Sequence, residues 1–358
     1  MYSEQDLRGA VEAGAISADA AAALRNHVAA LRATPTVDEE HFRLLTGFND
    51  IFVAIASALL LSALAWIGGS VWTPLGGVAV AVGAWGLAEY FTRIRRMALP
   101  SILLLLAFVG GVAGALIGVI AEYNRPLELW IDSMDGNRQM QFAAVGGIAA
   151  AIAAVTAGAA WLHWRRFMVP ITVAAGAVAV AGVVMALVLG LVPGADRAVY
   201  PLVLATGVAM FAFAMRWDMS DRERRTRRSD VAFWLHLAAA PMIAHSVFHM
   251  LGVFDHAIGT GTAVLVLVLY VAFACVALAV DRRALLVSSL AYVLFALVSL
   301  FRTAGAVELS AAFTGLVIGS ALLLLSAFWH RARGLVVGLL GNLDRRLPPV
   351  QQPVLAHA

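Results

Sequence analysis

Ten long apolar stretches, separated by short polar turns, fill this chain between Ile51 and Trp329. A helix needs roughly 20 apolar residues to cross the 30 Å hydrocarbon core of a bilayer, and each stretch is about that long. The expected spans are 51–69, 73–92, 99–121, 142–162, 168–192, 199–217, 231–253, 259–280, 284–301 and 307–329. The pattern therefore predicts an all-α polytopic membrane bundle of about ten transmembrane helices.

The polar turns alternate in charge along the chain. Fourteen arginines lie in one set of segments, at 93–96, 165–166, 222–228, 282–283 and 331–333. The segments on the opposite side hold four arginines. Because basic residues favour the cytoplasmic side, the arginine-rich set is predicted to be cytoplasmic, with both termini on that side. This arrangement is typical of a multi-pass protein of a bacterial inner membrane.

Composition agrees with a membrane protein. Hydrophobic residues make up 62% of the 358 residues and charged residues only 13%, about half the share in a soluble domain. All 25 basic residues are arginine, which together with the alanine content is typical of a GC-rich bacterial genome. The turns account for the basic excess, so no nucleic-acid partner is predicted. Cys275 is the single cysteine, which excludes an internal disulfide.

The polar ends define two further regions. Residues 1–48 are predicted to form a cytoplasmic helical hairpin, residues 49–330 the transmembrane bundle, and residues 331–358 an interfacial helix and tail. Gly14 suits the end of the first short helix and Ser17 the start of the second. Residues 3–45 hold too few large apolar side chains for an independent core. We expect them to contact the inner turns, a second copy or a protein partner, and the oligomeric state stays open.

Two helical pairs resemble each other in sequence. A shift of 70 residues places Arg95 and Arg96 on Arg165 and Arg166, and Pro100 on Pro170. The same shift brings the Gly-Gly pair at 76–77 onto that at 146–147. One interpretation is a duplicated two-helix hairpin in parallel orientation. The alternative is chance, because inner turns attract arginines in any membrane protein.

Helix packing is predicted from small residues. Gly110, Gly114 and Gly118 recur at every fourth position of the third stretch, which would give a groove for a neighbouring backbone.

Titratable groups inside the membrane are the main functional candidates. His245 and His249 lie one helical turn apart in the seventh stretch, so they share a face. Such a pair can be polar packing, a proton or solute site, or a weak metal site. The whole candidate cluster comprises His236, His245, His249, Asp255, His256 and Glu122. No cofactor and no catalytic residue is predicted, because no P-loop, nucleophile elbow, HExxH or CxxC motif occurs.

The N-terminal hairpin, the segment GFNDIFV at 47–53 and the array of Arg-Arg turns carry a resemblance to known proteins. Together they resemble a group of uncharacterised bacterial multi-pass inner-membrane proteins with a short cytoplasmic N-terminal helical hairpin. The resemblance covers most of the chain and implies no activity or active residue. Two hypotheses remain: a transporter or channel for a small solute, and a membrane scaffold or sensor whose hairpin at 3–45 binds a protein. A membrane-embedded enzyme using the histidines is the less favoured third.

Overall fold

A computed structural model shows the architecture of the chain. It describes residues 9–24, 48–134, 137–222, 224, 226–253, 259–303, 305, 308–341 and 347. The chain divides into two compact units, Met1–Leu44 and Leu45–Ala358. Across the described residues the secondary structure is helical, without a strand.

Among the described residues of the second unit, ten helices are long and apolar enough to cross a membrane, which confirms the predicted all-α polytopic class. The elements of this unit are α3 (Phe48–Val71), α4 (Thr73–Ala88), η1 (Glu89–Ile94), α5 (Ala98–Glu122), α6 (Asn124–Asp132), α7 (Arg138–Phe167), α8 (Ile171–Leu191), η2 (Ala195–Ala198), α9 (Val199–Met219), α10 (Arg227–Met250), α11 (Thr260–Val280), α12 (Ala284–Thr303), α13 (Ser310–Ala327) and α14 (Trp329–Leu339). The π-helix η1 continues α4, so the two together form one span.

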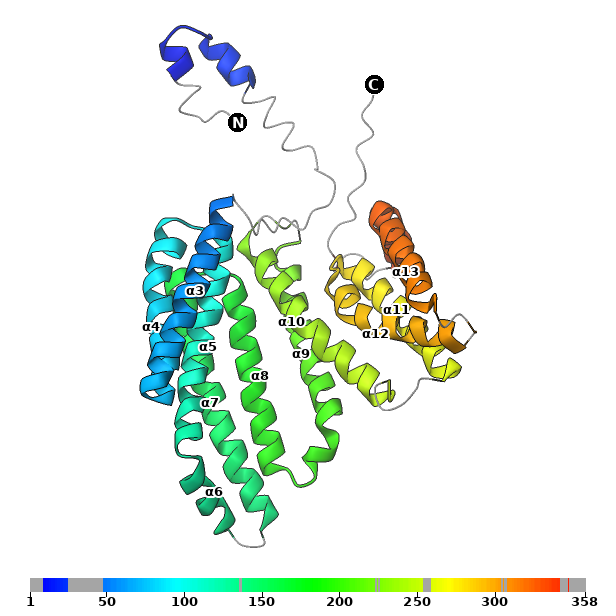
Figure 1. Ribbon diagram of the computed structural model, residues 1–358. Coiled ribbons are helices and arrows are strands. Elements are labelled where there is room, and N and C mark those ends of the chain that lie inside the picture. The colour runs from blue at the N-terminus through cyan, green and yellow to red at the C-terminus, as the bar shows by residue number, and fades with distance from the viewer. Residues whose placement is uncertain are drawn as a thin grey trace. The chain divides into compact units, whose positions relative to one another are not determined.

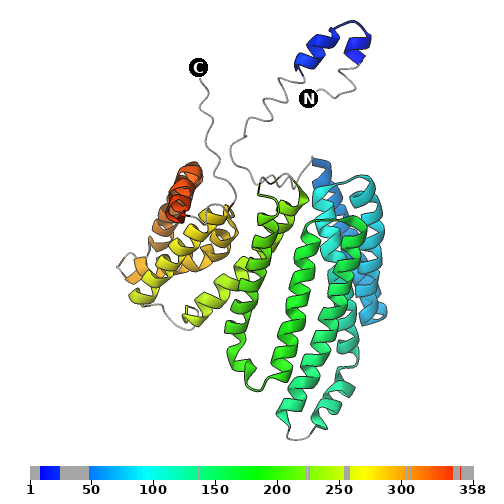
Figure 2. The same cartoon turned by 180° about the vertical axis from the view of Figure 1, so that it is seen from behind.

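Successive helices pair as antiparallel hairpins (Figures 1 and 2). The pairs are α4 with α5, α7 with α8, α9 with α10, and α11 with α12. Helix α3 contacts α4 and α5, and α13 contacts α12. Helix α10 contacts α8, α9 and α12, and half of its apolar segment is buried, the largest share among the ten spans. It therefore connects the earlier hairpins to the later ones.

The four turns that close these hairpins share a backbone feature. Among its described residues, each turn has one non-glycine residue with a positive φ angle: Arg96 at 53°, Met168 at 55°, Arg224 at 53° and Asp281 at 57°. A left-handed residue ends a helix by turning the chain away from the axis. We call this side of the bundle, where the four turns lie, the arginine-rich end. The shared geometry agrees with a repeated hairpin, and duplication stays a prediction.

The glycines of α5 that pack against α4 are not the set that was predicted. Gly110 and Gly114 are exposed, and a Cβ atom at either would meet nothing within 4 Å. Gly111 and Gly118 are the buried glycines of α5, where an added Cβ would lie 2.8 Å from the Ala81 nitrogen and 2.9 Å from the Pro74 Cα. Of the predicted set, only Gly118 therefore packs closely on α4. The reason is helical phase: positions seven apart differ by about 20° around the axis, whereas positions eight apart differ by about 80°.

Helix α6 lies between α5 and α7 on the side opposite the arginine-rich end. Leu127 and Ile131 are half-buried there, whereas Leu129 and Trp130 are exposed. This short amphipathic helix has the form of a segment that lies along a membrane surface.

The C-terminal helix begins earlier than expected. An interfacial helix was expected within residues 331–358, whereas α14 starts at Trp329 and ends at Leu339. Trp329, Arg333 and Val337 are buried along one stripe, and Leu335 and Leu339 are exposed on the other side. The buried stripe shows that α14 packs on the bundle through one face.

The described part of the first unit contains two short helical segments, 9–12 and 18–24. Gly14 adopts a φ of +69° between them, and the Ser17 Oγ accepts a hydrogen bond from the Ala20 N–H at 3.1 Å. Both predicted helix ends are therefore confirmed.

Candidate functional site

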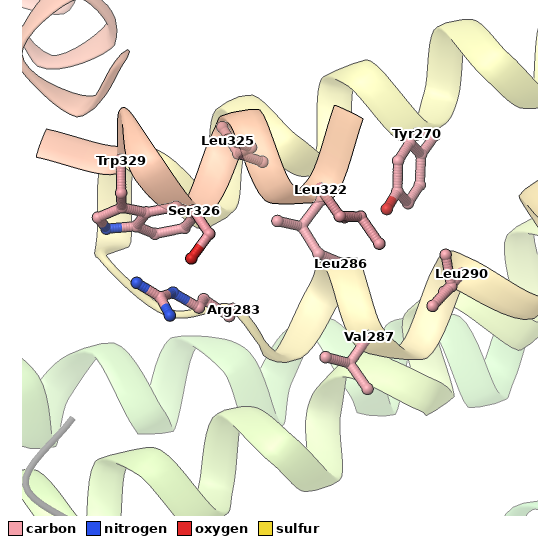
Figure 3. Close-up of a pocket in the computed structure, with 9 residues that line it drawn as sticks. All are labelled: Tyr270, Arg283, Leu286, Val287, Leu290, Leu322, Leu325, Ser326 and Trp329. Carbon is pink, nitrogen blue, oxygen red and sulfur yellow. The ribbon is translucent and has the colours of Figure 1, made fainter. Parts of the chain in front are cut away.

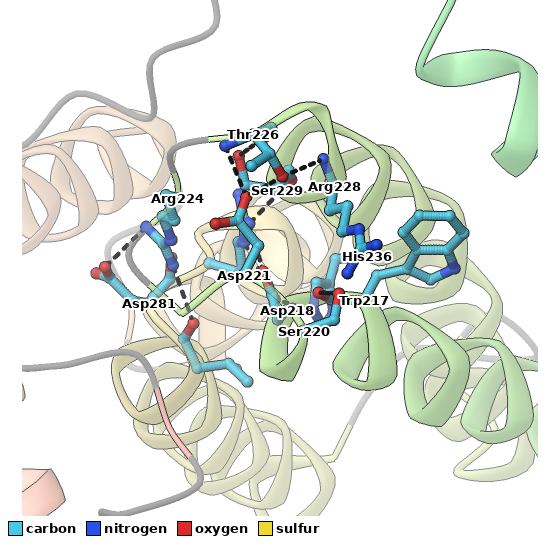
Figure 4. Close-up of polar contacts among 12 residues, drawn as sticks. Trp217, Asp218, Ser220, Asp221, Arg224, Thr226, Arg228, Ser229, His236 and Asp281 are labelled. Atoms are coloured by element: carbon cyan, nitrogen blue, oxygen red, sulfur yellow. Dashed lines mark hydrogen bonds and ion pairs between the residues drawn. The ribbon is translucent and has the colours of Figure 1, made fainter. Parts of the chain in front are cut away.

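Buried charged side chains gather at the arginine-rich end (Figure 4). Asp218, His236 and Arg282 are 2%, 2% and 4% exposed. We call these three residues the buried ionic triad. A charge leaves water at a large cost in free energy, so such groups persist only when they are paired and hydrogen-bonded.

The triad is closely bonded. Arg282 donates from Nη2 to Asp218 Oδ1 at 2.6 Å, and a second contact from its Nε to Oδ2 measures 3.4 Å. His236 Nε2 lies 2.8 Å from Asp218 Oδ2. Since a carboxylate can only accept, the His236 nitrogen that faces it carries the proton. Arg282 also donates to the Ser229 carbonyl at 3.1 Å, so its guanidinium binds two elements at once.

Three separate elements position these side chains. Asp218 lies in the last turn of α9, and His236 lies in the third turn of α10. Arg282 follows the left-handed Asp281 in the turn between α11 and α12. The Phe211 ring packs edge-on against His236, with centroids 4.9 Å apart. The triad therefore ties the α9–α10 hairpin to the α11–α12 hairpin.

A second carboxylate, Asp281, ties the same turn to α14. Arg224 donates to its Oδ2 at 2.9 Å, and Trp329 Nε1 donates to its Oδ1 at 2.8 Å. The Arg333 Nε lies 3.6 Å from the same Oδ1. Burial of the Asp281 carboxyl opposes ionisation, but the neighbouring arginines and the Trp329 N–H outweigh it and hold its pKa below the ordinary value. Asp281 is therefore an anion at neutral pH.

The histidines of α10 separate into two sites. His236 belongs to the buried ionic triad, and His245 lies nine residues further on, about 14 Å along the helix. His245 Nδ1 shares a 2.7 Å hydrogen bond with the Tyr292 hydroxyl. His249 stacks on Tyr200 with ring centroids 3.5 Å apart, and 6.0 Å separates the two histidine rings.

The two histidines were predicted to share a face of α10, and their side chains differ in exposure. His249 is half-buried, whereas His245 is exposed on the described surface. Each is held by a tyrosine from a neighbouring helix, which corresponds to the polar-packing interpretation of the pair.

The other predicted members of the cluster do not join them in the described residues. Glu122 accepts a 2.8 Å hydrogen bond from the Thr73 Oγ1, so its partner comes from α4. Asp255 and His256 lie outside the described residues. No group of three His, Cys, Asp or Glu side chains that could hold a metal occurs in the part of the chain that the structure describes.

An ion pair links the first two hairpins at the arginine-rich end. Arg166 donates to both Glu89 oxygens, at 2.7 and 2.9 Å. Arg93, one helical turn after Glu89, is further away at 3.3 Å. Glu89 opens the π-helix η1, and π-helical turns occur frequently at functional sites. Because all three side chains are partly exposed, the pair is a surface link between hairpins.

A wide groove lies between α8 and α9. It has a volume of about 700 Å³, within the range of ligand sites in proteins. Its walls are almost wholly apolar, with Val180 and Val184 from α8 facing Ala205 and Phe213 from α9. The hydroxyl of Thr206 already donates to the Leu202 carbonyl at 2.8 Å. The groove therefore offers shape and apolar surface rather than charge.

Comparison with known proteins gives no relative to draw on. No protein-family model, no curated protein and no solved structure matches this chain.

The pairing of Asp218 with Arg282 was not predicted from the sequence. The available signal was an acid in the final turn of an apolar stretch, where a charge needs a partner. Nothing in the sequence identifies that partner, because Arg282 is 64 residues away.

Proposed function

We propose that this integral membrane protein is a transporter for a small apolar or amphipathic solute, a lipid or a similar molecule. The observation that carries the proposal is the α8–α9 groove, whose 700 Å³ would hold such a solute at membrane depth. We further propose a bacterial inner-membrane location with the arginine-rich end in the cytoplasm, which the bias of fourteen arginines against four supports.

The apolar walls argue for an apolar cargo. An ion entering the groove would lose its hydration and find no charged side chain among the lining residues. An acyl chain or ring would instead replace bilayer contacts by contacts with valine, alanine and phenylalanine side chains. Ala177 and Ala205 lie on opposite walls, and their small size leaves the space open.

The proposal is tested by filling the groove. In nanodiscs containing a photoactivatable phospholipid, the wild-type chain should crosslink preferentially at α8 and α9. The double variant Ala177→Phe/Ala205→Phe should reduce that labelling several-fold. Ala154→Phe is the matched control, because Ala154 is exposed on α7 and does not line the groove. Equal labelling along all lipid-facing helices, unchanged by the double variant, would refute a specific site.

Movement of the solute needs a second assay. Proteoliposomes should carry a fluorescent short-chain phospholipid between leaflets faster than protein-free vesicles, and the double variant should slow this exchange. Lipid binding without faster exchange between leaflets would refute transport and leave lipid binding as the function of the groove.

A scaffold or sensor is the second candidate. It is favoured by the division of the chain into two compact units, of which Met1–Leu44 is one. A chain lacking residues 1–44 distinguishes the two. A transporter should retain its rate of lipid exchange without this unit. A sensor controlled by the first unit should lose that control when the unit is removed.

A further inference from the structure

A second cavity lies between α11, α12 and α13, close to the arginine-rich end (Figure 3). It has a volume of about 120 Å³ and is separate from the α8–α9 groove. We call it the α12–α13 pocket. Leu286, Leu290 and Leu322 form its apolar middle, and Figure 3 shows polar groups at both of its ends.

A positive charge stands at one end of the pocket. Arg283 lines it, and the Arg283 guanidinium lies over the Trp329 ring with its Cζ 4.7 Å from the centroid. Ser326 contributes a hydroxyl beside them. The cation–π contact fixes the guanidinium in place, and an arginine so held is suited to bind a carboxylate through two hydrogen bonds.

A buried hydroxyl stands at the other end. The Tyr270 oxygen is buried and makes no hydrogen bond to the described residues. A buried donor without a partner is costly, and a ligand oxygen that accepts from it would remove that cost. In Figure 3, Tyr270 lies beside Leu290 at the end of the pocket away from Arg283. Leu290 lies in α12, seven positions after Arg283, which corresponds to about 10 Å along a helix.

We propose that the α12–α13 pocket binds an elongated organic acid with a carboxylate at one end and an oxygen acceptor near the other. The carboxylate would pair with Arg283 and Ser326, the apolar body would lie on Leu286 and Leu322, and the distal oxygen would accept from Tyr270. The volume is close to that of a cavity that holds one benzene ring, so the apolar body has about six to eight carbon atoms. This site does not rest on the α8–α9 groove, and the two proposals can fail separately.

The test compares three probes that differ by one feature each. Octanoate, 8-hydroxyoctanoate and octylammonium are equilibrated with the full chain in lipid nanodiscs, and empty nanodiscs are subtracted. The hydroxylated acid should bind about fivefold tighter than octanoate, because it alone reaches Tyr270 with an oxygen. Octylammonium should show no saturable binding, because it carries the same charge as Arg283.

Two variants assign these differences to the pocket. Tyr270→Phe should erase the preference for the hydroxylated acid while octanoate still binds. Arg283→Gln should weaken both acids at least about tenfold. Tyr292→Phe and Arg165→Gln are matched controls, because neither residue lines the pocket, and they should leave both affinities unchanged.

A preference that persists in Tyr270→Phe, or equal binding of the acid and the amine, overturns the proposal. Thermal melting of each variant excludes loss of fold as the cause. Fatty acid dissolved in the bilayer is tested as a competitor. Competition by oleate identifies a membrane acid as the source of the ligand, and competition by water-soluble acids alone identifies a free acid.

Discussion

Asp218 is the residue that joins the other two members of the buried ionic triad. Its two oxygens accept from His236 and Arg282, and its side chain is almost fully enclosed. A buried pair adds little net stability compared with a well-packed apolar pair, but removal of one partner leaves an uncompensated charge. The arrangement therefore predicts a large effect from a small change at this position.

Replacing Asp218 by Asn should destabilise the bundle by about 3–5 kcal/mol, because the Arg282 guanidinium would stay buried without its counter-ion. The matched control is Asp196→Asn, since Asp196 is exposed on η2 at the other end of α9. Denaturant unfolding in detergent micelles measures both variants. Equal free energies of unfolding for the two would show that the triad does not hold charge in the folded state.

Helices α4 and α5 contact each other through glycines. The position of each glycine around its helix axis determines whether it lies in that contact. A Cβ atom at Gly77 would collide with the Ala115 backbone and lie 2.6 Å from the Gly111 carbonyl oxygen. Helices α4 and α5 therefore approach closely at Gly77 and Gly111. Gly114 lies on the same helix as Gly111 but faces open space.

We expect Gly77→Leu to separate α4 from α5 and to lower the free energy of unfolding by at least about 1–3 kcal/mol. Gly114→Leu adds the same side chain to α5 at an exposed position, and it should have little effect on yield or melting temperature. A Gly77→Leu protein that melts like the Gly114→Leu protein would contradict the close approach of these two helices.

Local pattern predicts the elements well and their contacts poorly. The ten spans follow from runs of apolar residues, each of which is complete within its own stretch of sequence. The hairpin turns follow from the positions of the arginines in the same way. The glycine prediction failed for Gly110 and Gly114 because spacing alone does not say which side of a helix meets a neighbour.

The candidate site required information from several elements. His236 was recognised as a titratable group, but it was grouped with His245 because both lie on α10. Its partner Asp218 comes from α9. Arg282 comes from a turn that lies 46 residues after His236 in the sequence. Periodicity within one helix carries no information about such long-range pairs.

At the scale of the whole molecule, the apolar helices and the arginine-rich turns together define how the hairpins are arranged. Ten apolar helices, joined as four hairpins with a helix before and after them, place every hairpin turn at the arginine-rich end. The buried ionic triad and Asp281 then join the α9–α10 hairpin, the α11–α12 hairpin and α14 at that end. The proposed transport and the α12–α13 pocket both depend on this arrangement in a bilayer.

Reporter fusions test this arrangement most directly. An alkaline phosphatase moiety, which is active only outside the cytoplasm, is joined after Ser133 beyond α6 or after Asp221 in the α9–α10 turn. We expect high activity for the Ser133 fusion and none for the Asp221 fusion, with the opposite order for a cytoplasm-active reporter at the same positions. Equal activity at the two positions, or the reverse order, would contradict a ten-span bundle with its arginine-rich end in the cytoplasm.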